Sequence, residues 1–322
     1  MLNGKHILLI IVGAVFAAAL VSFWWSSGSG AEGGPAGQRQ EQSVDNAGNM
    51  VIRDDSGERV ECELPVERIV SCYSAFTVML ERLNAEKCLV GATRKQARRL
   101  GIKSIGTHLK PVLESILAVE PDLVVISSNR SEIVNRLRRH LRSAGIELLA
   151  LHPESVEETL VCLRMLGKLT GTEKRADDLL RQVEKKLAAI DRSVADISSS
   201  GRRPSVFFEV RSMPSLLTCG MDSVAYDVIR RAGGKPVYSK SGTVKKVPLE
   251  LVVDKEPDFY IQQKGVMNPN PVPPAEHSVL SNLECVQKGD VLQIDEKKIS
   301  RPNPDIAATV QEVHRFLFKE TY

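Results

Sequence analysis

A long amphipathic stretch near the middle of the chain constrains the fold more than any other feature. Between Thr172 and about Ser198, apolar residues recur three or four positions apart, and charged residues occupy most of the positions between them. This spacing places one apolar stripe along an α-helix. Thr172 is a candidate N-cap, and Glu173 would lie in the first turn. At 1.5 Å per residue the helix would span roughly 40 Å, about the width of a small domain.

Short apolar runs, typical of buried strands, alternate with helical patterns on both sides of this stretch. The part before it opens with a hairpin signal, in which residues 54–57 (Asp-Asp-Ser-Gly) separate two strand-like runs. Alternating strands and helices predict mostly parallel sheets covered by helices. We therefore predict an α/β fold of two similar Rossmann-like lobes, residues 50–170 and 200–322, linked by a single long backbone helix over residues 171–199.

An internal repeat supports two related lobes. Residues 113–126 read LESILAVEPDLVVI and residues 249–262 read LELVVDKEPDFYIQ, so a Leu-Glu pair and a Glu-Pro-Asp triplet recur at matching positions. One copy precedes the long helix and the other follows it, as expected if one α/β unit is used twice. We expect a ligand cleft between the lobes, because open α/β sheets bind ligands beyond the carboxyl ends of their strands. The Glu-Pro-Asp triplets themselves are interpreted as helix-to-strand turns.

The first 31 residues have the pattern of a signal peptide or a membrane anchor. An uncharged apolar run of 19 residues, 7–25, is followed by small residues that would allow cleavage after Ala31. Residues 32–49, rich in Gly, Gln, Asn and Ser, predict a flexible linker. No cysteine lies near the end of the apolar run, which argues against a bacterial lipoprotein. Either interpretation places the remaining chain outside the cytoplasm. We expect it in the periplasm, free or held at the inner membrane by an uncleaved segment.

Composition and motifs exclude several functions. The net charge of +3 is too small to indicate a nucleic-acid partner. The six cysteines have no metal-ligand spacing, and their pairing stays open. His108, His140, His152, His277 and His314 are scattered, with His140 and His314 expected on helix surfaces, so we predict no metal site. The nucleotide, serine-hydrolase and zinc-protease motifs are missing, so we expect no enzyme and no cofactor.

The chain resembles the substrate-binding proteins of bacterial ABC importers, in the branch whose lobes are joined by one long helix. This branch includes proteins that bind ferric siderophores, haem and vitamin B12. The motifs that carry the resemblance, besides the two repeat copies, are VERIVS at 66–71, LGKLTGTEKRADDLL at 166–180, RRAGGKPVYS at 230–239 and SRPNPDIAATVQEVHRFL at 300–317. The resemblance implies capture of an iron complex, most simply a ferric siderophore, and delivery to an ABC permease dimer. A haem- or corrinoid-binding protein and a membrane-anchored sensory binding module are the alternatives.

The resemblance also assigns a role to one glutamate on each lobe. Glu114 and Glu250 match the positions at which such proteins dock onto arginines of the permease. Two separated carboxylates at equivalent places would form a two-point clamp for a basic dimeric partner. The alternative interpretation is that both are favoured near helix N-termini by the helix dipole, which is compatible with docking.

Candidate ligand contacts come from residues just beyond predicted strand ends. Arginine and lysine recur among these residues, and such cations suit a ligand with carboxylate or phosphate groups. The predicted set is Tyr73, Arg94, Lys95, His108, Arg130, Arg211, Lys240 and Arg301. Of these, Arg94, Arg211 and Arg301 fall at cleft positions implied by the resemblance. For each basic residue, the alternative is a solvated surface charge.

Two of these residues bear on a haem ligand. Tyr73 or His108 could supply an axial ligand to iron, although a packing or hydrogen-bonding role is the alternative for each. Both tryptophans lie in the N-terminal apolar run, so the predicted cleft has no tryptophan to hold a large planar ligand.

Overall fold

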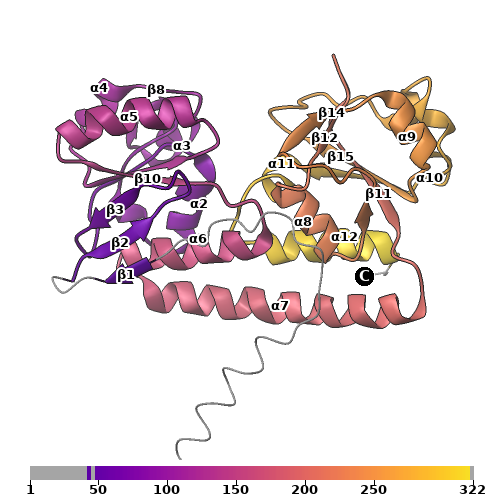
Figure 1. The fold of residues 1–322 in the computed structure, drawn as a ribbon, viewed down its shortest axis with the longest axis horizontal. Helices are drawn as coiled ribbons and strands as arrows, with labels where there is room; N and C mark the ends of the chain where they lie inside the picture. The colour runs from indigo at the N-terminus through magenta and orange to yellow at the C-terminus, as the bar shows by residue number, and fades with distance from the viewer. Residues whose placement is uncertain (1–41, 45–47, 320–322) are drawn as a thin grey trace, which may run out of the picture. The chain divides into compact units, whose positions relative to one another are not determined.

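The computed structural model describes residues 42–44 and 48–319 (Figure 1). The predicted signal or anchor segment, and most of the predicted linker, lie outside the described residues. The chain divides into residues 1–39 and residues 40–322, and the second unit is described below. Among the described residues, no helix has the length and apolar character needed to cross a membrane.

The first lobe is built on a parallel sheet with the strand order β10-β9-β4-β5-β6. The strands are β4 (Ile69–Ser71), β5 (Leu89–Ala92), β6 (Lys103–Ser104), β9 (Leu123–Ser127) and β10 (Glu147–Leu151). The helices are α2 (Ser74–Arg82), α3 (Arg94–Leu100), α4 (Leu113–Leu117), α5 (Ser131–Ser143) and α6 (Val156–Leu169), with a short 3₁₀ turn, η1 (Glu86–Cys88). The central strands β4 and β9 are buried along their whole length, as expected for a sheet covered on both faces.

Two small antiparallel sheets complete this lobe. β1 (Gln42–Val44) pairs with β2 (Met50–Arg53), which forms the predicted hairpin with β3 (Arg59–Cys62). Asp54 closes the hairpin turn by accepting hydrogen bonds from the backbone N–H groups of Ser56 and Glu58, at 2.9 and 3.1 Å. Its other oxygen pairs with the buried Arg138 of α5 at 2.6 Å, which fixes the hairpin to the lobe. β7 (Gly106–Thr107) and β8 (Lys110–Pro111) form a second, shorter hairpin.

The second lobe has a mixed sheet. Its strands follow the order β14-β12-β11-β15-β16, with β13 also pairing with β11. They are β11 (Ser205–Arg211), β12 (Leu217–Cys219), β13 (Lys235–Pro236), β14 (Val244–Lys246), β15 (Phe259–Lys264) and β16 (Val291–Asp295). The helices are α8 (Val224–Arg231), α9 (Leu249–Lys255), α10 (Glu284–Gln287), α11 (Glu296–Ile299) and α12 (Ile306–Phe318), with 3₁₀ turns η2 (Pro274–Glu276) and η3 (Leu280–Asn282). The predicted α/β fold of two lobes with mostly parallel sheets is confirmed, although the antiparallel strands β12 and β14 were not foreseen.

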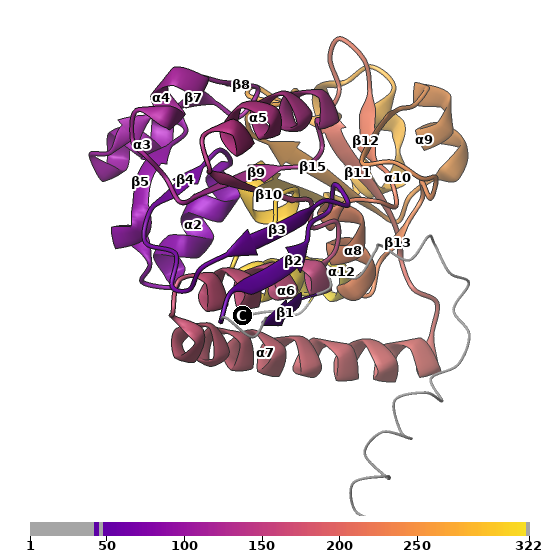
Figure 2. The same cartoon turned by 60° about the vertical axis from the view of Figure 1, so that its left-hand side comes forward.

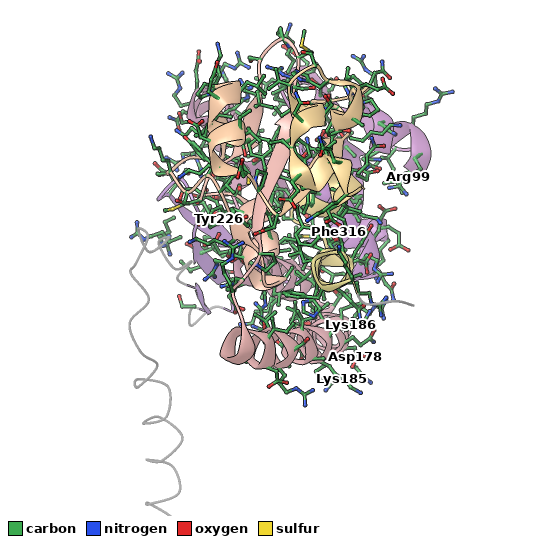
Figure 3. All side chains as sticks on the ribbon, turned by 90° about the vertical axis from the view of Figure 1, so that its right-hand side faces the viewer. Arg99, Asp178, Lys185, Lys186, Tyr226 and Phe316 are labelled. Atoms are coloured by element: carbon green, nitrogen blue, oxygen red, sulfur yellow. The ribbon has the colours of Figure 1, made fainter. Side chains whose placement is uncertain are left out.

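One long helix, α7 (Glu173–Ser200), packs against α6 of the first lobe and α12 of the second (Figures 1 and 2). Its apolar stripe is buried at Ala176, Leu179, Leu180, Val183, Leu187 and Ile190. Charged residues such as Asp178 and Lys185 lie on its outer surface (Figure 3). Thr172 occupies the N-cap position but makes no side-chain capping bond, and its hydroxyl lies 2.9 Å from that of Thr170 instead.

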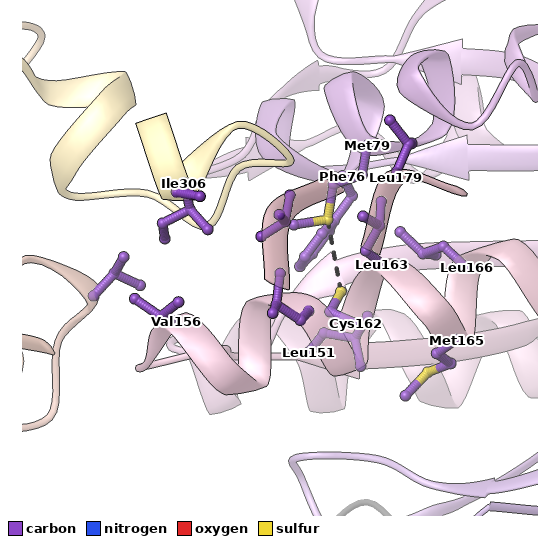
Figure 4. Packing of buried hydrophobic residues seen from close by; sticks show 14 of the residues in the cluster. Phe76, Met79, Leu151, Val156, Cys162, Leu163, Met165, Leu166, Leu179 and Ile306 are labelled. Carbon is purple, nitrogen blue, oxygen red and sulfur yellow. Dashed lines mark hydrogen bonds between the residues drawn. The ribbon is translucent and has the colours of Figure 1, made fainter. Parts of the chain in front are cut away.

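A shared core runs along these helices. It includes residues of both lobes, and Val156 of α6 and Ile306 of α12 belong to the same cluster (Figure 4). Within it, the Sγ atom of Cys162 lies 3.8 Å from the Sδ atom of Met79. A hydrogen bond also joins the two lobes here, because the carboxylate of Asp227 on α8 accepts from the backbone N–H of Val156 on α6 at 2.9 Å. The lobes are therefore packed on a common base as well as being linked by α7.

The internal repeat is visible in the backbone. Glu120 and Glu256, which begin the two triplets, have φ angles of 43° and 41° and end the helices before them in a left-handed turn. Asp122 accepts a hydrogen bond from the backbone N–H of Arg68 at 2.8 Å, just before β4. Asp258 does the same for the N–H of Ser205, at the start of β11, at 2.6 Å. Each triplet is thus a helix-to-strand turn tied to the neighbouring strand, as predicted.

Candidate functional site

A cavity of about 420 Å³ lies between the lobes, at the carboxyl ends of the parallel strands. The first lobe lines it with residues that follow β4, β9 and β10, and the second with residues from β11, β12, β15 and the loop between α11 and α12. Apolar surface makes up most of the walls, and charged and hydrogen-bonding side chains from both lobes are set among it. The position agrees with the cleft predicted from the topology.

Arg301 is the best-connected charged group in this cavity. Its Nε donates a hydrogen bond to the carboxylate of Glu296 at 3.0 Å, and its Nη1 donates to the hydroxyl of Ser74 in the first lobe at 3.0 Å. The guanidinium also lies over the ring of Tyr73, 5.9 Å from its centroid. Arg301 is therefore partly neutralised by Glu296, and it joins the two lobes across the cavity.

Tyr73 and His108 form the aromatic wall beside Arg301. Their ring centroids are 5.9 Å apart, and both side chains line the cavity. Burial raises the pKa of the Tyr73 phenol, and Arg301 offsets part of that rise. Burial, Arg301 and Arg130 lower the pKa of His108. Both groups are consequently uncharged near neutral pH and present hydrogen-bonding atoms next to cations.

A second polar region of the cavity was not predicted. His152 and Glu154 follow β10 directly, and His152 Nε2 lies 3.2 Å from Glu154 Oε1. Burial, with help from Asp222 and Glu158, raises the pKa of Glu154 to about 7. Asp222 of the second lobe accepts hydrogen bonds from Ser241 Oγ at 2.6 Å and the Gly242 N–H at 2.7 Å, and these bonds lower its pKa.

The sequence held a signal for only part of this region. Residues after β10 satisfy the same strand-end rule that selected Tyr73 and Arg130, so His152 and Glu154 could have been included. Asp222 precedes α8 in a loop and has no such signal. Gln263 lines the cavity and is fully buried. Its side-chain oxygen accepts a hydrogen bond from Ser300, whereas its Nε2 has no hydrogen-bond partner among the described residues.

The structure brings together half of the predicted ligand residues. Tyr73, His108, Arg130 and Arg301 line the cavity. The others do not line it: Arg94, Lys95, Arg211 and Lys240. Arg94 and Lys95 begin α3 directly after β5 and are exposed outside the cavity, whereas His108 reaches it from the turn between β7 and β8.

The remaining two lie elsewhere in the second lobe. Lys240 is exposed in the loop before β14. Arg211 is half-buried at the end of β11, with Nη2 3.5 Å from Ser215 Oγ. The expectation for a further residue, His314, was wrong. It is buried on α12, between Ser193 Oγ at 3.0 Å and the Ala232 carbonyl at 2.9 Å.

The predicted docking glutamates are exposed on equivalent helices. Glu114 lies in the first turn of α4 and Glu250 in the first turn of α9. Neither carboxylate takes part in an ion pair within the described ranges. In Figure 1, α4 and α9 lie on different lobes, both on the side of the molecule away from α7. The two carboxylates are thus presented to solvent at one side, each by its own lobe.

No set of three or more His, Cys, Asp or Glu side chains able to hold a metal ion is found in the described part of the chain. All six cysteines lie there as buried free thiols. Burial raises the pKa of Cys72, which lies next to the cavity residue Tyr73, to about 12. Its thiol is therefore protonated at neutral pH and is a poor metal ligand.

The fold and the cavity define a two-lobed solute-binding protein, and comparison with known proteins agrees. Residues 69–297 match the family described as periplasmic binding protein. An uncharacterized ABC transporter substrate-binding lipoprotein of Bacillus subtilis (strain 168) is 22% identical over 313 residues, which cover 96% of this chain and 98% of that protein.

Two solved structures share the fold. One is an ABC-type Fe3+-hydroxamate transport system from Saccharomonospora viridis DSM 43017, with a TM-score of 0.65 and 20% identity, covering 83% of this chain and 98% of that chain. The other is the periplasmic vitamin B12-binding protein of Vibrio cholerae, with a TM-score of 0.66 and 18% identity, covering 79% of this chain and 98% of that chain.

The chain belongs to the periplasmic binding protein family. It is a substrate-binding protein and not an enzyme, and the resemblance to substrate-binding proteins of ABC importers is confirmed. The first cysteine of the given sequence is Cys62, which is buried in β3.

Proposed function

We propose that this protein captures a ferric siderophore in the interlobe cavity, outside the cytoplasm, and delivers it to an ABC permease dimer. The observation that carries the proposal is the cavity itself, which both lobes line and where Arg130 and Arg301 stand beside Tyr73 and His108. Cations and hydrogen-bonding aromatic groups suit the anionic oxygens of a chelate, while apolar walls suit its organic backbone.

The composition of the cavity, and not its volume of about 420 Å³, favours an iron chelate over a large planar macrocycle. No tryptophan occurs after residue 25, so stacking on a broad indole face is excluded for a ligand held by the lobes. Haem is the second candidate, because Tyr73 and His108 place two potential iron ligands at the same wall. A corrinoid, or a sensory role for an anchored protein, would need other contacts.

Capture outside the cytoplasm follows from the N-terminal pattern together with the family. We propose that residues 7–25 direct export and that the lobes work in the periplasm. Because no cysteine is available for a lipid there, an uncleaved apolar segment would be the means of holding the protein at the inner membrane.

Calorimetric titration of the natively purified protein tests the cargo. We expect a 1:1 complex with a ferric trihydroxamate and much weaker binding of haemin and cobalamin. Arg130→Gln should weaken the chelate complex about tenfold, the usual effect of losing one charge-assisted contact. Arg94→Gln, which removes the same charge away from the cavity, is the matched control and should bind normally. Tight binding of haemin alone would replace the siderophore assignment.

A further inference from the structure

The first lobe carries an excess of positive charge that cargo binding does not use. Residues 94–142 contain eleven lysines and arginines and four acidic residues, a local net charge of +7, whereas the whole chain has +3. Three of these arginines are paired with carboxylates outside the segment: Arg99 with Glu81, Arg138 with Asp54 and Arg142 with Glu58. Most of the others are exposed and have no ion pair within the described residues.

The exposed face of α5 concentrates this charge. Arg136, Arg139 and Arg142 lie on it, while Val134, Leu137 and Leu141 face the core. The acidic residue of the helix is Glu132, in its first turn. A shallow surface hollow beside the helix is lined by Asn135, Arg138, Arg139, Arg142, Ser143 and Glu58. Arg138 and Arg142 are paired with carboxylates, which leaves Arg139 as the arginine of this hollow without an ion pair among the described residues. Exposed arginines can bind phosphate groups through paired N–H donors.

The position of α5 points to a particular partner. In both Figure 1 and Figure 2, α5 lies beside α4 and β8, at the end of the first lobe away from α7. Glu114, on α4, is the proposed permease contact, so this end would face a membrane during delivery. Glu114 is a single carboxylate among many cations, and a strongly basic permease surface would be repelled by its surroundings. These exposed cations would instead be attracted by an anionic surface next to the permease.

We propose that the exposed face of α5, defined by Arg136, Arg139 and Arg142, binds the anionic headgroups of a phospholipid bilayer. Each exposed arginine near an anionic bilayer strengthens the association severalfold, and the attraction falls off within a Debye length. Contact at this face would turn the end of the lobe that carries Glu114 toward the membrane. The inference rests on the proposed docking of Glu114 to a permease and on the placement of charge, and it is independent of the identity of the cargo.

Vesicle flotation tests this proposal with residues 40–322, which form a separate unit containing all of the cores described here. Removing residues 1–39 prevents the apolar run from inserting by itself. Vesicles of equal parts phosphatidylglycerol and phosphatidylcholine should bind the protein at low salt, and vesicles of phosphatidylcholine alone should not. The double variant Arg136→Gln/Arg139→Gln should bind the anionic vesicles roughly thirtyfold more weakly. Neither substitution breaks an ion pair described for the wild-type chain.

The matched control is Lys185→Gln/Lys186→Gln, which removes the same charge from the outer face of α7 (Figure 3). It should bind like the wild type. Equal losses in both double variants, or no binding of the wild type to anionic vesicles, would overturn the proposal. Cargo titration on the same samples keeps the two proposals distinct, because the α5 substitutions lie outside the cavity and should leave ligand affinity unchanged.

Discussion

Single residues set the polarity of the cavity. Arg301 was expected to offer a free cation to the ligand, yet its guanidinium is shared between Glu296, Ser74 and the Tyr73 ring. Its charge is therefore partly compensated before any ligand arrives, and Arg130, which has no ion pair in the part of the chain described, is the more available cation. Glu154 is the acidic counterpart of these cations. Its carboxyl group lies near Asp222 and a neutral His152, so it has no positive partner.

Glu154 should make stability depend on pH. Its pKa of about 7 in the folded protein exceeds the ordinary value of about 4.3, so the folded state holds this proton more tightly than the unfolded chain. Stability from this group is then complete below about pH 4 and is lost as the pH rises to about 7. Glu154→Gln cannot ionise, so its melting temperature should exceed that of the wild type at pH 8, with a smaller difference at pH 5.

Thermal unfolding of both proteins at the two pH values measures this effect. Since the carboxyl is partly exposed, solvent will reduce its size. A difference in melting temperature that is the same at pH 5 and pH 8 would show that Glu154 does not titrate in this interval.

At the scale of elements, helix packing beneath the cavity holds the two lobes together. α7 contacts both α6 and α12, and its buried stripe extends from Ala176 to Ile190. Because side chains of both lobes belong to the core along these helices, a hinge motion that separated the lobes widely would expose apolar surface. We therefore expect only a small closure on ligand binding, in agreement with a continuous helix as the connector.

Gly167 tests how closely α6 and α7 must approach. A Cβ atom added at this position would lie 2.6 Å from Cβ of Ala176 on α7. Gly167→Ala should destabilise the protein by about 1–3 kcal/mol, even though alanine favours a helix, because the two helices would be forced apart. Urea unfolding measures the loss. Adding Ala176→Gly removes the clashing atom and should restore much of the stability. No recovery in the double variant would place the strain elsewhere.

At the scale of the whole molecule, the two-fold repetition of the lobes matters most for the proposed delivery step. Glu114 and Glu250 occupy corresponding first turns on α4 and α9, and the helices that carry them lie on one side of the molecule, opposite α7. A dimeric permease could contact both lobes at once only if both carboxylates are presented together. The shared core holds the two lobes, and therefore the two glutamates, at a fixed separation, which two independently moving domains would not do.

Charge reversal at these sites should separate transport from binding. Glu114→Lys and Glu250→Lys should each greatly reduce cargo uptake by cells, because each replaces an attraction to the permease by repulsion. Cargo affinity in calorimetry should stay unchanged, since neither residue lines the cavity. Asp177→Lys, on the exposed surface of α7, is the control and should transport normally. Normal uptake by both lobe variants would refute the docking role.

Local patterns in the sequence determined the fold class, the long helix, the hairpin and the turns of the repeat. Each depends on spacing within one segment, such as the 3.6-residue period from Ala176 to Ile190 or the Glu-Pro-Asp triplet before a strand. Burial and side-chain period are properties of neighbouring residues, so the sequence alone contains them.

Tertiary structure alone decided which polar and charged residues lie together in the cavity. Tyr73 and Arg301 are 228 positions apart and lie together because of the strand order and the packing of the two lobes. The packing of the lobes leaves Arg94 outside the cavity and brings Glu154 near Asp222. The raised pKa of Glu154 has its origin in burial and in the charge of another lobe, neither of which is a property of a local segment. For that reason the class of this protein was accessible from its sequence, whereas the chemistry of its cavity required the folded chain.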